Sequence, residues 1–299
     1  MILDPEFFLS ALRVATPLII VALGVLVAEL VGILFLCVEG GMLCGALFGM
    51  LGASYFGDPW VGVACGLAAG ITAGLICAGL FVWVPADQVV IGLAFNIAAL
   101  GLTSFIFRAT TGVIKNSSAS LAWATPDWAV DHPFLSFLFQ VPPLAWLAAG
   151  LFLIAAYLLF RSAPGLMLRS VGQSVEAATS AGLDVLWVRT VAMGIAGGLA
   201  GLGGAALTVG WVHSFSDNIT AGRGFIALAV VYFGRWYPGW TFFGGLLFGA
   251  GEVLGLNAQV LGGNSHLYLM VPYVLTIIVL GMTGGGRGPR EVARPYERD

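Results

Sequence analysis

The sequence ATPLIIVALGVLVAELVGILFL, residues 15–36, is long enough to cross a bilayer and carries a single charged side chain, Glu29. A membrane-spanning helix needs about 20 consecutive apolar residues. The rest of the chain has a similar character: of its 299 residues, 59% are hydrophobic and 9% are charged. Soluble domains carry about 25% charged residues. This composition excludes a soluble enzyme, a nucleic-acid-binding protein and a disordered chain, and it indicates a polytopic membrane protein.

Further apolar segments follow along the chain. Together with the first, they lie near residues 11–36, 40–56, 60–82, 88–107, 142–160, 190–212, 224–234, 240–256 and 267–283. The segments are too long for the strands of a membrane β-barrel and lack its alternating pattern, so they predict helices. We expect an all-α polytopic membrane protein with roughly eight to ten transmembrane helices, some broken or half-spanning. Residues 1–299 are expected to form a single transmembrane domain.

The segment 224–234 is too short to cross the bilayer, because eleven residues at 1.5 Å each span about half of the hydrocarbon core. It follows the sequence NITAGRG, whose Asn218 and glycines permit a non-helical entry. A half-crossing is tolerated only where protein or a water-filled cavity surrounds it. This segment therefore predicts the position of a translocation path, with Asn218, Arg223 and Phe225 as candidate residues. Arg223 either lines that path or anchors the segment at the membrane interface.

Acidic side chains in or at the edge of apolar segments are candidates for the same path, because an ionised group there must face a cavity or a partner. These residues are Glu29, Glu39, Asp87 and Glu252. The alternative is structural, since a carboxylate also caps the positive end of a broken helix. For Asp87, which follows Pro85, a helix start is favoured, whereas Glu39 leaves both interpretations open. Glu39, Asp87, Gln88 and Asn96 are retained as path candidates.

Basic residues do not occur deep within the apolar segments, so we expect no ion-pair partner there for Glu29, Glu39 or Glu252. Their distribution nevertheless predicts orientation. Arginines bracket the segment 161–189 and crowd the tail 284–299, which indicates that both face the cytoplasm. The segment 108–141 is then extracytoplasmic. The charge pattern does not place the N-terminus.

Glycine recurs at every fourth position in three parts of the chain. The spaced glycines are Gly41, Gly45 and Gly49, then Gly62, Gly66, Gly70 and Gly74, then the pairs Gly194/Gly198 and Gly197/Gly201. This spacing puts glycine on one face of a helix, where it lets two helix backbones approach closely in lipid. Close helix packing is therefore predicted. A GxGxxG nucleotide loop is not supported, because no strand precedes these glycines.

Residues for catalysis or cofactor binding are missing from the sequence. The one lysine, Lys115, does not follow a glycine-rich phosphate-binding loop. The four cysteines lie inside apolar segments without a ligand spacing, and no second histidine stands at metal-ligand spacing. We expect no catalytic site, no metal and no cofactor. If ATP supplies the energy, a separate subunit hydrolyses it.

The loop 161–189 contains RSVGQSVEAATSAGLDV, residues 169–185. Ser170 and Gln173 have the spacing of a capping box, valines and alanine share one face, and Gly182 is a stop signal. These features predict a three-turn amphipathic helix. Its apolar side lacks the aromatic residues of a bilayer-surface helix, which favours docking into the groove of a partner protein.

Several stretches together resemble a known family. They are ATPLIIVALG at 15–24, VEGGMLCGA at 38–46, PADQVVIGLAFNIAALGLTSF at 85–105, the loop sequence above, and NITAGRGFIALAVVYFGRWYPG at 218–239. The chain resembles the permease subunits of bacterial ABC importers of the branched-chain amino acid and simple-sugar class, and within it the nucleoside (basic membrane protein-linked) permeases. It departs from the family pattern where Leu30, Phe35 and Cys37 replace the customary Arg, Asn and Gly.

The resemblance implies a set of partners and a location. The partners are a second permease subunit, expected to be a paralogue, a cytoplasmic ABC ATPase and an extracytoplasmic substrate-binding lipoprotein, all acting at the bacterial cytoplasmic membrane. The resemblance also implies that the loop couples the permease to the ATPase. The residues assigned to that coupling are Gly172, Gln173, Glu176, Ala177, Ala178 and Gly182.

The function expected from these observations is to form the translocation path of an ABC importer for a small polar solute, first of all a nucleoside. A simple-sugar permease of the ribose or galactose type is the alternative within the same class. A secondary transporter driven by an ion gradient is the alternative from another class. It would work without partners and would contain internal repeats and membrane-embedded charged pairs.

Overall fold

The computed structural model describes residues 5–84, 87–110, 140–260, 274, 277, 278, 281 and 288–292, and over these ranges the only regular elements are helices. Six helices in the described part are long and apolar enough to span a membrane. They are α1 (Pro5–Leu30), α3 (Pro59–Ala78, continued by the π-helical η1, Gly79–Trp83), α4 (Gln88–Thr110), α7 (Pro143–Arg161), α10 (Val185–Leu207, continued by η2, Thr208–Val212) and α12 (Pro238–Val260). The prediction of an all-α polytopic membrane protein is confirmed.

Further helices complete the described part of the bundle. They are α2 (Val38–Phe56), α8 (Ala163–Gln173), α9 (Val175–Ser180) and α11 (Arg223–Phe233). Each apolar segment predicted before residue 260 overlaps one helix of the structure. The predicted segment 267–283, most of the loop 108–141 and most of the tail 284–299 lie outside the described residues.

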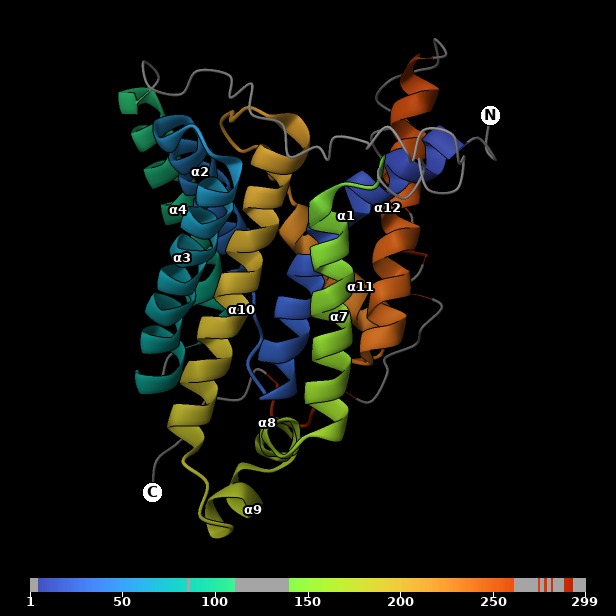
Figure 1. Ribbon diagram of the computed structural model, residues 1–299. Coiled ribbons are helices and arrows are strands. Elements are labelled where there is room, and N and C mark those ends of the chain that lie inside the picture. Colours follow the sequence, from blue (N-terminus) through green and yellow to red (C-terminus); the bar gives the residue numbers. More distant parts are fainter. Residues whose placement is uncertain are drawn as a thin grey trace.

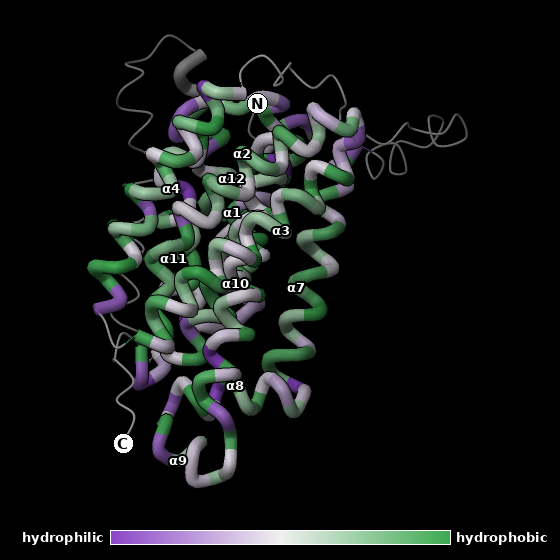
Figure 2. Tube along the Cα trace, turned by 90° about the vertical axis from the view of Figure 1, so that its left-hand side faces the viewer, coloured by the Kyte–Doolittle hydropathy of each residue, from purple (hydrophilic) through white to green (hydrophobic). Residues whose placement is uncertain are grey.

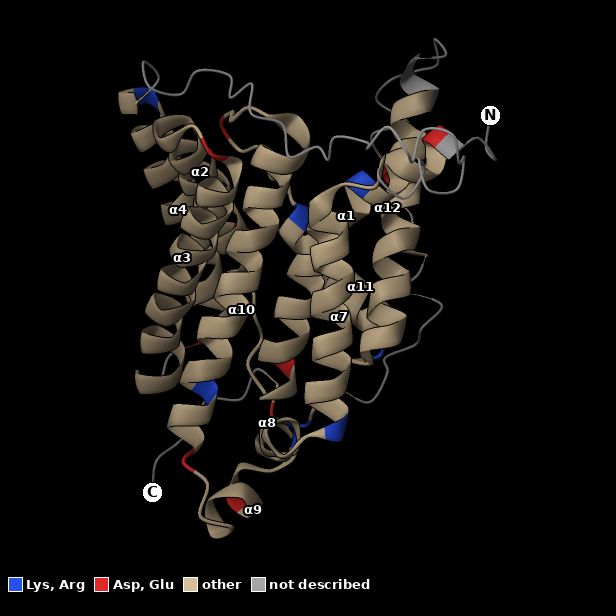
Figure 3. Ribbon diagram, in the orientation of Figure 1, with Lys and Arg blue, Asp and Glu red and all other residues tan. Residues whose placement is uncertain are grey.

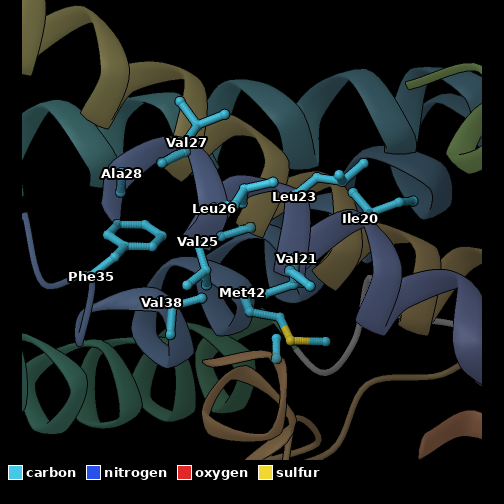
Figure 4. Close-up of a cluster of buried hydrophobic side chains, with 14 of the residues drawn as sticks. Ile20, Val21, Leu23, Val25, Leu26, Val27, Ala28, Phe35, Val38 and Met42 are labelled. Atoms are coloured by element: carbon cyan, nitrogen blue, oxygen red, sulfur yellow. The ribbon is translucent and has the colours of Figure 1, made fainter. Parts of the chain in front are cut away.

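Helix α1 lies at the centre of the bundle and packs against α10, α12, α11 and α7. Its residues from Val14 to Leu30 are buried. Ile20, Val21 and Leu26 are fully buried and meet Phe35 and Met42 from the next segment in one cluster (Figure 4). Helix α4 is the opposite case, since apolar residues such as Ile97 and Phe105 are exposed on it. Figure 2 shows α4 and α11 on one side of the bundle, away from α3 and α7.

The glycine-rich helices α2, α3 and α10 pack backbone against backbone, as the spacing of their glycines predicts. A Cβ atom added at Gly45 would lie 2.2 Å from the backbone of Gly201, and one at Gly70 would lie 2.3 Å from the carbonyl oxygen of Gly197. Only glycine permits these approaches. Van der Waals contact between such small surfaces is a main source of helix association in lipid.

The stretch 11–36 is a helix followed by a break. Helix α1 ends at Leu30, Gly32 takes a left-handed backbone conformation with φ of 84°, and α2 begins only at Val38. Helix α11 has 11 residues and corresponds to the predicted half-span at 224–234. Both interruptions occur within the bundle, where backbone groups need partners from protein.

One end of the bundle carries α8 and α9, which extend below the long helices in Figure 1. The colouring in Figure 3 shows Lys, Arg, Asp and Glu gathered toward the two ends of the bundle, with few between them. Residues 288–292 of the tail also lie at the α8 end, because the Glu291 N–H donates a hydrogen bond to the Gly172 carbonyl at 3.1 Å. The predicted loop and the described part of the tail therefore share one face of the protein.

Candidate translocation path and coupling element

Glu39, on the first turn of α2, caps the beginning of α11. Its carboxylate accepts hydrogen bonds from the Thr220 hydroxyl at 2.6 Å, the Gly222 N–H at 2.8 Å and the Gly224 N–H at 2.7 Å. The first N–H groups of a helix have no partners within it and carry the positive end of the helix dipole. A Cβ at Gly224 would lie 2.6 Å from Oε2 of Glu39, so glycine is needed there. The geometry supports the structural interpretation of Glu39.

Gln88 and Asn96 of α4 hydrogen-bond to the break between α1 and α2. The Gln88 side-chain oxygen accepts from the Leu34 N–H at 2.9 Å. The Asn96 amide bonds twice, accepting from the Gly40 N–H and donating to the Leu36 carbonyl, both at 2.8 Å. Backbone groups in a membrane-embedded break must be satisfied by protein. Both path candidates thus border the interruption and hold its backbone in place.

Asp87 caps α4, as the helix-start interpretation predicts. Its carboxylate accepts from the Val89 N–H at 2.8 Å and the Val90 N–H at 3.1 Å. The side chain is exposed at the end of the helix. Asp87 and Glu39 share no hydrogen-bond partner, so the structure does not bring these two candidates together.

Arg223, the first residue of α11, forms an ion pair with Glu252 of α12. Its guanidinium carbon also lies 5.4 Å from the ring centre of Trp211. Glu252 therefore has a basic partner, which lies at the edge of the apolar segment 224–234 rather than deep within a segment. Arg223 begins a half-helix inside the bundle. The ion pair joins two residues 29 positions apart in the chain, a separation that no local spacing reveals.

Asn218 and Phe225 flank the same helix start. Asn218 lies in the turn that leads into α11, has φ of 56°, and its carbonyl accepts from the Ala221 N–H at 3.0 Å. Phe225 is 40% exposed, whereas the following residues of α11 as far as Val231 are buried. The structure thus gathers Glu39, Arg223 and Phe225 around the beginning of α11.

Sequence reasoning missed two polar contacts at the opposite end of the break. Arg189 of α10 is 2% exposed, and its Nε donates to the Val31 carbonyl at 3.2 Å. Trp236, in the turn between α11 and α12, donates from Nε1 to the fully buried Glu29 at 2.6 Å. These contacts fasten the end of α1 to two distant segments. Their only signal in the sequence was the presence of polar groups at segment edges.

The loop helix differs from the prediction, because it is divided into α8 and α9. Ser174 ends α8 with extended backbone angles, and its hydroxyl accepts from the Ala177 N–H at 3.2 Å to begin α9. The predicted capping role of Ser170 is therefore wrong, and Ser174 has that role. The predicted apolar face does form, since Val171 and Ala178 are buried together with Val185.

The six residues assigned to coupling separate into an exposed and a buried group. Gln173, Glu176, Ala177 and Gly182 are exposed, and Gly182 ends α9 with φ of 82°. Gly172 and Ala178 are buried. A Cβ at Gly172 would lie 2.1 Å from the Leu30 carbonyl oxygen, so α8 packs directly against the end of α1.

Comparison with known proteins assigns this architecture to a family. The model of the branched-chain amino acid transport system permease component matches residues 7–280. The chain belongs to this permease family. No solved structure matches it. The guanosine ABC transporter permease protein NupQ of Bacillus subtilis is 33% identical, over 96% of this chain and 95% of its own length.

Other relatives of this permease are named for two kinds of solute. The nucleoside ABC transporter permease protein NupC of Lactococcus lactis is 32% identical, over 90% of this chain and 89% of its own length. The putative glucose ABC transporter permease protein TsgC13 of Haloferax volcanii is 32% identical, over 84% of this chain and 77% of its own length. The permease is thus a multi-pass membrane subunit of an ABC transport system, a class that includes an ATPase and a binding protein.

Proposed function

We propose that this permease forms a translocation path for a nucleoside in an ABC importer of the bacterial cytoplasmic membrane. Its likeness to NupQ and NupC over most of the chain supports a nucleoside. An extracytoplasmic lipoprotein delivers the solute, and the whole chain serves as one permease domain. ATP hydrolysis takes place on a separate ATPase subunit.

The observation that carries the proposal is the charge balance at the beginning of α11. The N-terminus of a half-helix attracts an anionic group of a substrate. Here the Glu39 carboxylate of the same chain fills that position. The adjacent Arg223 is paired with Glu252. The Arg223–Glu252 pair is neutral, and the positive end of α11 offsets part of the remaining charge of Glu39. No position for an anionic group is left there, which suits a neutral nucleoside better than the free carboxylate of an amino acid.

The contacts of the loop support its proposed coupling role. Helix α9 exposes Glu176 and Ala177 to a partner, while Gly172 of α8 contacts the end of α1 and the tail. A movement of α8 would therefore reach the break directly. We place this end, and with it the C-terminal tail, in the cytoplasm. Because α1 ends there, its beginning near Pro5 is extracytoplasmic in this arrangement.

A simple sugar is the second candidate solute, on the strength of the likeness to TsgC13. A simple sugar is uncharged too, so the argument from the charges at the beginning of α11 applies equally to it. The second permease subunit is proposed to be a paralogue. Co-purification from native membranes with this chain tagged, followed by mass spectrometry, distinguishes a paralogue from a second copy.

Uptake into cells tests the function. Radiolabelled guanosine, other nucleosides, ribose and glucose are supplied to cells with and without this gene, after ATP depletion by arsenate or gradient collapse by an ionophore. We expect guanosine uptake to depend on the gene, to fall with arsenate and to tolerate the ionophore. Gene-dependent uptake of sugars alone would replace the nucleoside by a sugar. Uptake lost with the ionophore alone would contradict ATP-driven import.

A further inference from the structure

We infer that Trp211, Arg223 and Glu252 form a binding site for the vicinal hydroxyl groups of a sugar ring. This inference rests on the proposed function, and it names the part of the solute that the permease recognises. The three residues come from η2, α11 and α12, which meet at the beginning of α11. The side chains of Arg223 and Glu252 are 18% and 13% exposed, so the cluster lies just beneath the accessible surface.

Both members of the ion pair have unused hydrogen-bonding capacity. Oε2 of Glu252 and Nε of Arg223 are buried without a hydrogen-bond partner in the described part of the chain. Buried polar atoms are costly unless they are satisfied. Glu252 Oε1 and Arg223 Nη2 satisfy each other in the ion pair. Glu252 Oε2 remains as an acceptor and Arg223 Nε as a donor for a ligand.

The remaining atoms match a hydroxyl group. A carboxylate oxygen only accepts hydrogen bonds, and a guanidinium N–H only donates them, whereas a hydroxyl can do both. Two neighbouring hydroxyls can donate to Glu252 and accept from Arg223 at the same time. The opposite charges of the pair cancel, so a neutral ligand binds without bringing an unbalanced charge into the bundle.

Trp211 adds an apolar surface to these polar groups. An indole ring provides a large rigid face with little conformational freedom to lose, and the C–H side of a sugar ring can lie against such a face. The ribose of a nucleoside and the ring of glucose share both the hydroxyls and the C–H surface. A common sugar-ring site accounts for relatives that are named for guanosine and for glucose.

The local structure holds the site in position. Arg223 also donates from Nη1 to the Ile219 carbonyl at 3.2 Å, and the next residue, Gly224, is bound to Glu39 at 2.7 Å. The arginine is thereby attached to the turn before α11 and, through the beginning of the helix, to α2. Groups fixed in this way lose less freedom when a ligand binds.

Equilibrium binding to the assembled permease–ATPase complex in lipid nanodiscs tests the inference. The binding protein is left out because it selects solutes itself. Tritiated guanosine is the probe, and unlabelled guanosine and 2′,3′-dideoxyguanosine compete with it. We expect the unaltered complex to prefer the ribonucleoside. In Glu252→Gln the affinity for guanosine should fall about tenfold, while that for the dideoxynucleoside stays unchanged.

Further variants separate recognition from folding. Arg223→Lys keeps the charge opposite Glu252 but removes the Nε donor, so it should reduce the same preference with little effect on assembly. Asp217→Asn is the matched control, because Asp217 forms its ion pair with Arg108 at 3.1 Å outside the cluster. It should leave both affinities unchanged.

The inference is overturned if either cluster variant leaves the ratio of the two affinities as it is in the unaltered complex, whether or not both affinities fall. It is also overturned if the unaltered complex binds no guanosine while cells still import it, an outcome that leaves the proposed function intact. Absence of gene-dependent guanosine uptake into cells would instead contradict the proposed nucleoside function.

Discussion

The carboxylate of Glu39 on α2 accepts a hydrogen bond from the N–H of Gly224 on α11 at 2.7 Å, so a side chain of α2 caps the first turn of α11. Thr220 and Gly222 donate to the same carboxylate. A half-helix inside a membrane protein has to satisfy its first N–H groups without water. The acidic residue at the start of α2 is therefore explained by the free end of α11.

Glu39→Gln tests this relationship. The amide keeps one oxygen as acceptor, but it loses the negative charge and directs an NH2 group at a backbone N–H. We expect a loss of stability of about 1–3 kcal/mol, measured as a lower melting temperature in detergent. Glu176→Gln, a change of the same kind on the exposed side of α9, should melt like the unaltered protein. An unchanged melting temperature in Glu39→Gln, combined with altered solute selectivity, would assign Glu39 to the path itself.

The packing of the glycine helices gives a second prediction. In Gly45→Ala the new Cβ would lie 2.2 Å from the backbone of Gly201, and neither backbone can give way without separating α2 from α10. Overpacking of this kind costs about 1–3 kcal/mol or more, so the yield of folded protein in size-exclusion chromatography should drop sharply. Gly101→Ala is the control on α4, since no atom lies within 4 Å of the added Cβ. Equal yields of the two variants would contradict close packing at Gly45.

These two predictions illustrate which features a sequence reveals. The spacing of Gly45 and Gly70 and the short apolar run after Arg223 are local patterns, and these patterns correctly predicted the close packing and the short helix α11. The Arg223–Glu252 pair and the contact of Arg189 with Val31 join residues far apart in the chain. No periodicity encodes such partners.

The division of the coupling loop was missed for a different reason. Helical spacing continued through Ser174, so the apolar pattern predicted one helix. The serine hydroxyl instead bonds to the Ala177 N–H, a local contact that competes with helix continuation. Gln88 and Asn96 were predicted only as path candidates, and that role stays a prediction. Their hydrogen bonds go to backbone atoms of Leu34, Leu36 and Gly40, which the sequence alone does not indicate.

Asn96 provides a third prediction. Asn96→Leu removes both hydrogen bonds to the break, at the Gly40 N–H and the Leu36 carbonyl. Each lost bond leaves a backbone group without its partner and costs about 1 kcal/mol or more, so the melting temperature should fall. Asn96→Asp retains the acceptor for Gly40 and should fall less. If Asn96→Leu is as stable as the unaltered protein, the break obtains its hydrogen bonds elsewhere.

The coupling surface gives the last prediction. Gly182 has φ of 82° and donates its N–H to the Thr179 carbonyl at 2.9 Å. Proline has no N–H and is confined to φ near −65°, so Gly182→Pro should displace the end of α9. Glu176→Lys reverses an exposed charge there without disturbing any described hydrogen bond of its side chain. Both variants should reach the membrane in normal amounts and lose guanosine uptake, with less ATPase co-purifying. Asp217→Asn, in the turn before α11, should retain both. Normal uptake in the two loop variants would remove α9 from the contact with the ATPase.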